Sequence, residues 1–224
     1  SGLLAEVLPE LAATIGCEQP PEFHPEGDVY AHIRLMLSQL PEAADTGLIW
    51  SVLMHDIAKP VTASRDDDGC IRFFGHEKTG TDMARAILNR LRFPNAEIDT
   101  VTSCVRYHMQ LKDAREMRTA TLRKLFLRSV FATELELHRL DCLSSSGRLD
   151  NFEFLQAKFE AFQNQPELQQ PLLDGSDLIA LGQAPGPGFG VLLKEARERQ
   201  LEGELTTRDQ ALGWLEAKVR AVTE

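Results

Sequence analysis

The chain has 224 residues, of which 43% are hydrophobic and 26% charged, a balance typical of a soluble globular protein. No stretch approaches the roughly 18 consecutive apolar residues of a membrane span, and the first residues lack the basic and apolar segments of a signal peptide. The net charge of −10 argues against a broad electrostatic surface for nucleic acid and leaves only a narrow phosphate site. The four scattered cysteines, without a Cys-x-x-Cys pair, favour free thiols in a cytoplasmic protein.

Apolar residues recur at steps of three and four along most of the chain, which predicts amphipathic helices. In chain order, the expected helices lie near residues 29–40, 49–57, 80–91, 98–111, 119–128, 131–144 and 150–163. One segment departs from this pattern, because residues 61–64 and 71–74 flank the acidic turn 66–69, which ends in Gly69. Such a turn favours a small β-hairpin. The sequence therefore predicts an all-α bundle with one hairpin.

The character of the chain changes near residue 166. Pro166 and Pro171 interrupt helicity, and the string PGPG at residues 185–188 predicts a tight connection. Residues 206–209 (TTRD) then open a last helix with a suitable N-cap. We therefore expect a first domain at residues 1–165 and a helical tail subdomain at residues 166–224.

Histidine and aspartate residues fall on the apolar faces of several expected helices. His32 follows Val29 by three residues, and Asp56 follows Val52 by four. A buried imidazole or carboxylate is unfavourable unless it is hydrogen-bonded, paired or bound to a metal. A single inward histidine is most often a satisfied core residue, whereas several on separate helices favour a shared cation.

Four strings carry these histidines and aspartates in order, namely residues 28–32 (DVYAH), 53–60 (LMHDIAKP), 74–77 (FGHE) and 105–109 (VRYHM), and Asp141 follows them. This order resembles the HD superfamily of metal-dependent phosphohydrolases. The resemblance implies that one divalent metal ion is bound by His32, His55, Asp56 and Asp141. It also implies that His76 and His108 hold a second ion, which Asp56 bridges to the first. Imidazole and carboxylate donors suit Mg, Mn, Ni, Co or Fe better than a closed thiolate site suits zinc.

A bound metal ion lowers the pKa of its water ligand and neutralises charge on phosphoryl oxygens. On this interpretation His55 and Asp56 are catalytic, and Lys59 neutralises the substrate phosphate. The alternative for Lys59 is a solvated side chain near a helix end. Arg106 is a further substrate-binding candidate, and His24, in a proline-rich loop, either lines the mouth of the site or has no chemical role.

A narrower resemblance is to the C-terminal half of bacterial CCA-adding tRNA nucleotidyltransferases and poly(A) polymerase-like enzymes. It rests on residues 23–29 (FHPEGDV), 137–143 (LHRLDCL), 177–182 (DLIALG) and 201–208 (LEGELTTR). In that family, a catalytic head with a Gly-Ser loop and paired strand aspartates precedes this region. This chain shows neither feature, so the resemblance implies that nucleotide transfer does not reside in it.

Two functions follow as hypotheses. The first is a divalent-metal-dependent phosphohydrolase that cleaves 2′,3′-cyclic phosphates, 2′-nucleotides or terminal phosphates, either on a phosphorylated nucleotide or at a tRNA 3′ end. The second is a non-catalytic, tRNA-binding body and tail that serves an upstream nucleotidyltransferase head domain. In the tail, Lys194, Arg197 and Arg199 form either a modest basic face for RNA or an ordinary solvated helix face.

Overall fold

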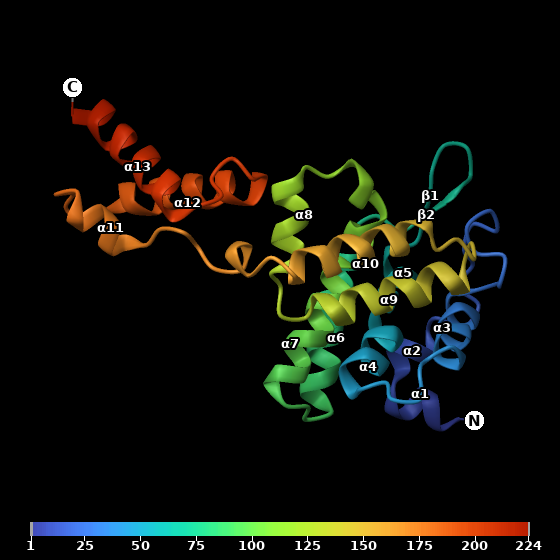
Figure 1. Ribbon diagram of the computed structural model, residues 1–224. Helices are drawn as coiled ribbons and strands as arrows, with labels where there is room; N and C mark the ends of the chain where they lie inside the picture. The colour runs from blue at the N-terminus through green and yellow to red at the C-terminus, as the bar shows by residue number, and fades with distance from the viewer. Residues whose placement is uncertain (1, 224) are drawn as a thin grey trace. The chain divides into compact units, whose positions relative to one another are not determined.

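The computed structural model describes residues 2–223, which form two compact units joined by the chain. The first unit contains the residues up to Ala114 together with Val130–Leu155, and the second contains Arg115–Ser129 together with the residues from Gln156 onward. Figure 1 shows that both are built mainly of helices. The all-α prediction is therefore confirmed.

Most of the secondary structure belongs to the first unit. Its elements are α1 (Leu3–Val7), α2 (Pro9–Ala12), α3 (Val29–Ser38), α4 (Thr46–Met54), α5 (Lys59–Thr62), β1 (Ser64–Arg65), β2 (Ile71–Arg72), α6 (His76–Arg90), α7 (Asn95–Tyr107) and α9 (Phe131–Ser144). The 3-10 helix η1 (His108–Glu116) and helix α10 (Asp150–Gln163) run from one unit into the other.

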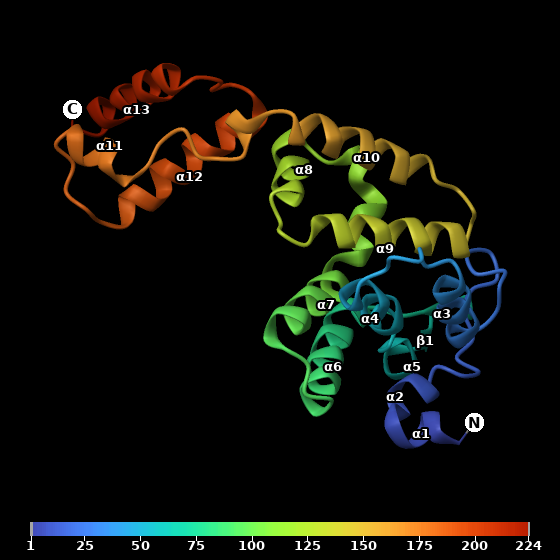
Figure 2. The same ribbon diagram turned by 60° about the horizontal axis from the view of Figure 1, so that its bottom comes forward.

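The apolar stripes that predicted these helices form the core of the first unit. Val29, Ile33 and Met36, spaced along one face of α3, are at most 1% exposed. Helices α6 and α7 lie side by side, as Figures 1 and 2 show, and α4 packs against α7. Gly80 permits the close approach of α6, because a Cβ atom there would meet Val105 Cγ1 at 3.1 Å. Burial of these faces is the main driving force for the fold.

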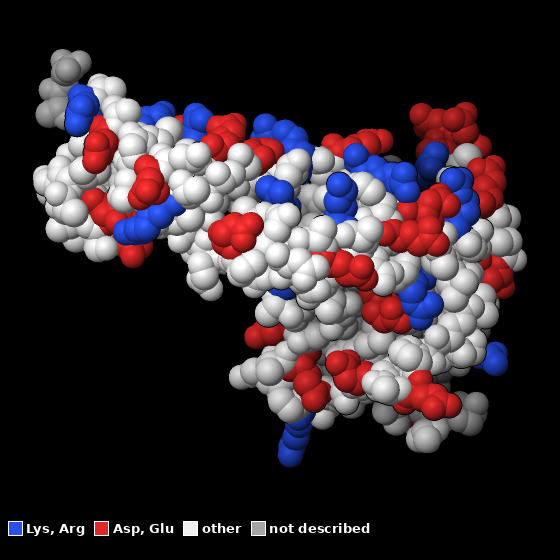
Figure 3. Space-filling model, in the orientation of Figure 1, with Lys and Arg blue, Asp and Glu red and all other residues white. Residues whose placement is uncertain are grey.

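The expected hairpin is present, but its strands are shorter than predicted. Strand β1 pairs with β2 in antiparallel register, with Ser64 opposite Arg72. Residues 61 and 62, expected in the first strand, instead complete helix α5, where the Thr62 hydroxyl donates to the Ala58 carbonyl at 2.9 Å. Gly69 has a φ of +78°, as the turn requires. Acidic side chains gather over this turn (Figure 3).

The second unit contains α8 (Thr119–Phe126), the 3-10 helix η2 (Pro166–Leu168), α11 (Gly175–Ala180), α12 (Pro187–Glu202) and α13 (Arg208–Thr223). Its buried apolar core includes Leu173, Leu178 and Leu215. Helix α8 belongs to this unit because it packs against α12 and because the Arg123 guanidinium donates to the Leu201 carbonyl at 2.8 Å. The sequence placed the same helix within residues 1–165. The expected domains, residues 1–165 and 166–224, stay a prediction. The two packing units describe how the chain folds and do not define family domains.

The last helix begins as predicted, since Thr207 precedes α13 and its hydroxyl accepts a hydrogen bond from the Gln210 amide at 3.3 Å. Within residues 2–223, no helix has the length and apolar character needed to cross a membrane.

Candidate metal centre

Six polar side chains from five segments converge in the interior of the first unit. His32 lies on α3, His76 opens α6, and Asp141 lies on α9. His55 and Asp56 follow the end of α4, and His108 follows the end of α7. Each of the six residues is at most 9% exposed. The sequence predicted all six as metal ligands, and the structure brings them into one cluster; that they bind a metal stays a prediction.

Local features of the chain hold these residues in place. Asp28 caps the start of α3, because its Oδ1 accepts from the Ala31 amide at 2.7 Å while its Oδ2 accepts from the Gly16 amide at 2.7 Å. This double contact fixes the first turn of the helix that presents His32. Gly75, with a φ of +75°, turns the chain so that His76 becomes the first residue of α6.

Asp56 is the centre of the cluster. Its Oδ2 lies 2.7 Å from Lys59 Nζ and 3.1 Å from His55 Nε2. Its Oδ1 lies 3.4 Å from His76 Nε2 and 3.8 Å from His108 Nε2. The two oxygens therefore face two different groups of donors, which is the arrangement a bridging carboxylate adopts between two neighbouring cations.

His32 and Asp141 complete the side of the cluster next to His55. His32 Nε2 lies 3.3 Å from Asp141 Oδ1, and the His32 and His55 ring centroids are 5.5 Å apart. The Nε2 atoms of His32 and His55 are buried and have no well-directed hydrogen bond to any described residue. Buried polar atoms without a hydrogen-bond partner are uncommon in proteins, and a bound water or ion commonly satisfies them.

Three of the four cluster histidines are held by the same kind of hydrogen bond. His55, His76 and His108 hydrogen-bond the carbonyl oxygens of Val52, Phe73 and Val105 through Nδ1, at 2.8–2.9 Å. Because a carbonyl only accepts, each Nδ1 carries the proton, and the Nε2 lone pair of a neutral ring points into the cluster. This is how metal-binding histidines are held by their outer hydrogen bonds. Imidazole nitrogens and buried carboxylates that converge in this way fit a divalent cation.

Charge and burial shift the pKa values in opposite directions across the cluster. Burial opposes protonation of His32, but Asp141 and Glu26 outweigh it and raise its pKa to about 9. Burial lowers the pKa of His108 to about 3. Burial also disfavours the charged forms of Asp56 and Asp141, yet neighbouring histidines and lysines hold both pKa values well below the ordinary range. Both carboxylates are therefore ionised at neutral pH.

A cavity of about 740 Å³ opens onto this cluster. His76 and Asp141 form part of its wall, next to Lys59, Lys112 and the aromatic ring of Phe73. Its rim includes Phe23 and Phe74, whose side chains are 59% and 80% exposed. The cavity thus combines cationic groups, aromatic surface and one carboxylate of the cluster, that of Asp141.

The three predicted substrate-binding residues lie in different surroundings. Lys59 is only 6% exposed; its ammonium contacts Asp56 and donates to Gln19 Oε1 at 2.6 Å, so the solvated alternative is wrong. His24 lines the cavity, as one of its two alternatives predicted. Arg106 is not among the residues that line it, and its guanidinium lies 3.9 Å from Glu77 on the side of α6.

Three residues of the site were missed. Glu26 hydrogen-bonds His24 and His32, Gln19 holds Lys59, and Lys112 lies close enough to Asp141 to lower its pKa. Gln19 and Glu26 lie in the irregular segment before α3, where no periodicity marks an inward side chain. The only available signal for Glu26 was its place in the segment HPEGDV, which the family resemblance already singled out.

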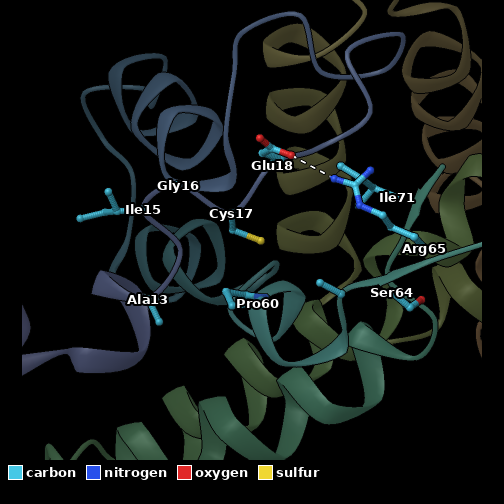
Figure 4. Close-up of a pocket in the computed structure, with 10 residues that line it drawn as sticks. Ala13, Ile15, Gly16, Cys17, Glu18, Pro60, Ser64, Arg65 and Ile71 are labelled. Atoms are coloured by element: carbon cyan, nitrogen blue, oxygen red, sulfur yellow. Dashed lines mark hydrogen bonds and ion pairs between the residues drawn. The ribbon is translucent and has the colours of Figure 1, made fainter. Parts of the chain in front are cut away.

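A second cavity, of about 550 Å³, lies between the segment around Cys17 and the hairpin (Figure 4). Its charged side chains pair with each other, since Arg65 Nη2 lies 3.3 Å from Glu18 Oε2. Burial raises the pKa of the Cys17 thiol, which keeps the sulfur protonated. We assign no chemistry to this cavity.

Two of the three cations for which the sequence left open a basic face or a solvated helix face, Arg197 and Arg199, are engaged by other groups of the second unit. Arg197 donates to the carbonyls of Leu168 and Gln170, and Arg199 pairs with Glu195 and Glu204. Arg197 thus links α12 to the segment 168–170, whereas the partners of Arg199 lie in or just after α12 itself. Figure 3 shows Lys and Arg mixed with Asp and Glu on the face it draws.

The chain is similar to proteins that add nucleotides to tRNA. An A-adding tRNA nucleotidyltransferase of Deinococcus radiodurans is 33% identical over 227 residues, which cover 96% of this chain and 52% of the relative. A CC-adding tRNA nucleotidyltransferase of Thermus thermophilus is 35% identical over 222 residues, with 96% and 50% covered. A multifunctional CCA protein of Alkalilimnicola ehrlichii is 36% identical over 152 residues, with 67% and 33% covered. The chain therefore spans about half the length of the first two relatives.

These similarities correct one expectation. The chain was expected to be a metal-dependent phosphohydrolase, but the matching proteins are named for nucleotide addition to tRNA, and the matching family is one of nucleotidyltransferases. The error has a physical reason, because a cluster of histidines and aspartates fixes where a cation can bind but not which reaction follows. The comparisons support a body related to CCA-adding enzymes and do not show membership of the HD superfamily.

The family model matches the chain from the hairpin to the last helix. Its description is tRNA nucleotidyltransferase domain 2, and the matched residues are 72–215. Because this match covers more than half of the chain, the chain belongs to the tRNA nucleotidyltransferase family and contains the domain 2 of that family.

Proposed function

We propose that this chain is the non-catalytic, RNA-holding body of a tRNA nucleotidyltransferase, and that nucleotide transfer takes place in a separate head domain. The names of the relatives and their roughly twofold greater length support this assignment. The matched family region, domain 2, supports it further. The partners of the chain are then the 3′ end of a tRNA and the catalytic head.

We further propose that the His/Asp cluster binds one or two divalent cations. The observation that carries this proposal is the convergence of four imidazole Nε2 atoms on two ionised carboxylates, with the Nε2 atoms of His32 and His55 left without a hydrogen-bond partner in the described chain. The nitrogen-rich donor set favours Mn, Fe, Co or Ni over Mg, which prefers oxygen ligands. A bound ion supplies positive charge that neutralises phosphate oxygens.

The cavity above the cluster is the proposed site for the phosphorylated end of the RNA. Lys112 is exposed at its wall, and Lys59 and His24 lie deeper. Arg72 and Arg148 add charge at the edge, although each pairs with a nearby aspartate. With a net charge of −10, the chain would hold RNA through this local site, so we expect a modest dependence of affinity on salt.

Metal analysis of the purified chain tests the cation site. After reconstitution with Mn²⁺ and removal of unbound ion, we expect one or two ions per chain in the wild type and a clear loss in Asp56→Ala. Arg106→Met is the matched control, because Arg106 lies outside the cavity. A wild-type chain that retains no ion would contradict the proposed cation site.

Fluorescence anisotropy with an acceptor-stem RNA hairpin tests the RNA site. We expect Lys112→Met to weaken binding and to reduce the slope of log affinity against log salt by about one. Lys78→Met removes an exposed lysine of α6 that does not line the cavity and serves as the control. Equal affinities for the two variants and the wild type would contradict RNA binding at this cavity.

A further inference from the structure

Glu26 lies beside the cluster and hydrogen-bonds two histidines through one carboxylate oxygen. Its Oε1 accepts hydrogen bonds from His32 Nδ1 at 2.5 Å and from His24 Nδ1 at 2.9 Å. The Glu26 side chain is only 8% exposed, and its Oε2 is buried with no hydrogen-bond partner in residues 2–223. A buried carboxylate with one free oxygen is unfavourable unless a nearby positive charge compensates for it.

Glu26 makes His32 different from the other histidines of the cluster. His55, His76 and His108 each donate Nδ1–H to a neutral backbone carbonyl, whereas His32 donates to a carboxylate. A carboxylate behind the ring holds the proton on Nδ1, which makes Nε2 the atom that a cation would displace a proton from, and it makes that nitrogen a stronger donor. His32 is thus built to be the strongest nitrogen donor of the four.

The backbone around Glu26 is shaped to bring its carboxylate back to His32. Gly27 follows with a φ of +123°, a conformation that favours glycine, and its amide donates to the His24 carbonyl at 3.3 Å. Asp28 then caps α3. The reversal between residues 24 and 28 places Glu26 against a ring six positions further along the chain. The side-chain contact therefore depends on a turn and not on helical spacing.

We propose that Glu26 is a positioning residue of the cation site, which acts through His32 by fixing the orientation of its ring and the proton on Nδ1. This inference rests on the cation site of the proposed function. His24 shares the same carboxylate and packs edge-on against His32, with ring centroids 5.0 Å apart, so Glu26 also orients the His24 ring, which lines the cavity.

Calorimetric titration of the chain with Co²⁺ measures the effect. We expect Glu26→Gln, which keeps the size and removes the charge, to weaken Co²⁺ binding about 10-fold to 100-fold. The control is Glu42→Gln, which removes an exposed carboxylate outside the cluster and leaves the affinity unchanged. Circular dichroism confirms that each variant is folded. If Glu26→Gln does not fold, Glu26→Asp withdraws the carboxylate by one methylene and is expected to weaken binding in the same direction.

A second readout separates positioning from a general loss of structure. In proton NMR spectra of the Co²⁺-loaded chain, a histidine bound through Nε2 gives a strongly shifted Nδ1–H resonance. We expect the His32 resonance to broaden or disappear by solvent exchange in Glu26→Gln, while those of the other ligands persist. Unchanged affinity and an unchanged set of resonances would overturn the role of Glu26. Absence of Co²⁺ binding by the wild type would instead overturn the cation site itself.

Discussion

The Nε2 atoms of His76 and His108 lie 3.1 Å apart, although both rings already donate their Nδ1 protons to backbone carbonyls. Two neutral rings in this arrangement direct lone pairs at each other. A proton shared between them is disfavoured on His108, because burial lowers its pKa to about 3. Both nitrogens and Asp56 Oδ1 could hold a divalent cation, whose charge would satisfy all three groups.

The first prediction follows from this pair. A ligand that binds only the folded chain stabilises it, by about 2.7 kcal/mol at a concentration one hundred times its dissociation constant. We expect Mn²⁺ to raise the melting temperature of the wild type and EDTA to reverse the change. In His108→Ala the increase should shrink, whereas in Arg106→Met it should be retained. Thermal melts with and without Mn²⁺ measure the difference, and equal increases in all three proteins would contradict a role for His108.

Helical periodicity was sufficient to predict most of the fold. The spacing of Val29, Ile33 and Met36 fixed both the existence of α3 and its buried face. The limits of the hairpin were less predictable, because β-branched Val61 and Thr62 favour strands while one turn of helix there depends on contacts with Ala58. One-turn elements are set by local hydrogen bonds, which leave no periodic pattern in the sequence.

The site was predictable where its residues lie in recognisable strings at or near helices. It was missed at Gln19 and Glu26, which lie in a loop, and at Lys112, which lies in η1 outside those strings. The six cluster residues each occur in a recognisable string, and the structure brings them together. Glu26 and Gln19 act from irregular backbone, so only the folded chain shows their partners. Arg106 was a candidate by its place near His108, but it does not line the cavity, and its guanidinium lies 3.9 Å from Glu77.

The second prediction concerns the buried pair of Asp56 and Lys59. Removing one member of a buried ion pair leaves the other charge uncompensated, at a typical cost of about 3 kcal/mol. We therefore expect Asp56→Asn to lower the free energy of unfolding of the metal-free chain by about that amount. In a Lys59→Met background the same change should cost about 2 kcal/mol less, because no buried ammonium remains. Urea denaturation of the four proteins measures the coupling; additive effects would mean that the 2.7 Å contact contributes little.

The third prediction is a stability maximum of the metal-free chain near pH 6.5. The pKa of His32 in the folded chain, about 9, lies above the ordinary value of 6.5. Its contribution to the free energy of unfolding is therefore fully present below pH 6.5 and is lost as the pH rises through 9. The difference corresponds to about 3 kcal/mol. The pKa of His108 in the folded chain, about 3, lies below the ordinary value, so the unfolded chain binds a proton there more readily. The free energy of unfolding therefore falls as the pH drops from 6.5 toward 3. Urea denaturation in EDTA at pH 5, 6.5 and 9.5 checks the maximum, and His32→Gln should flatten the alkaline side.

The fourth prediction separates structural from solvated cations in the second unit. Arg197 donates to the Leu168 carbonyl at 2.7 Å, to the Gln170 carbonyl at 3.0 Å and to Gln200 Oε1 at 2.8 Å. Arg197→Met leaves these acceptors without their charged donor, so we expect it to lower the free energy of unfolding by about 2 kcal/mol. Lys194 is exposed on the same helix, and Lys194→Met should change stability by less than about 0.5 kcal/mol. Denaturant titrations compare the two variants. Equal stabilities would mean that Arg197 is as solvated as Lys194, which would return both alternatives for the tail, a basic face for RNA and an ordinary solvated helix face.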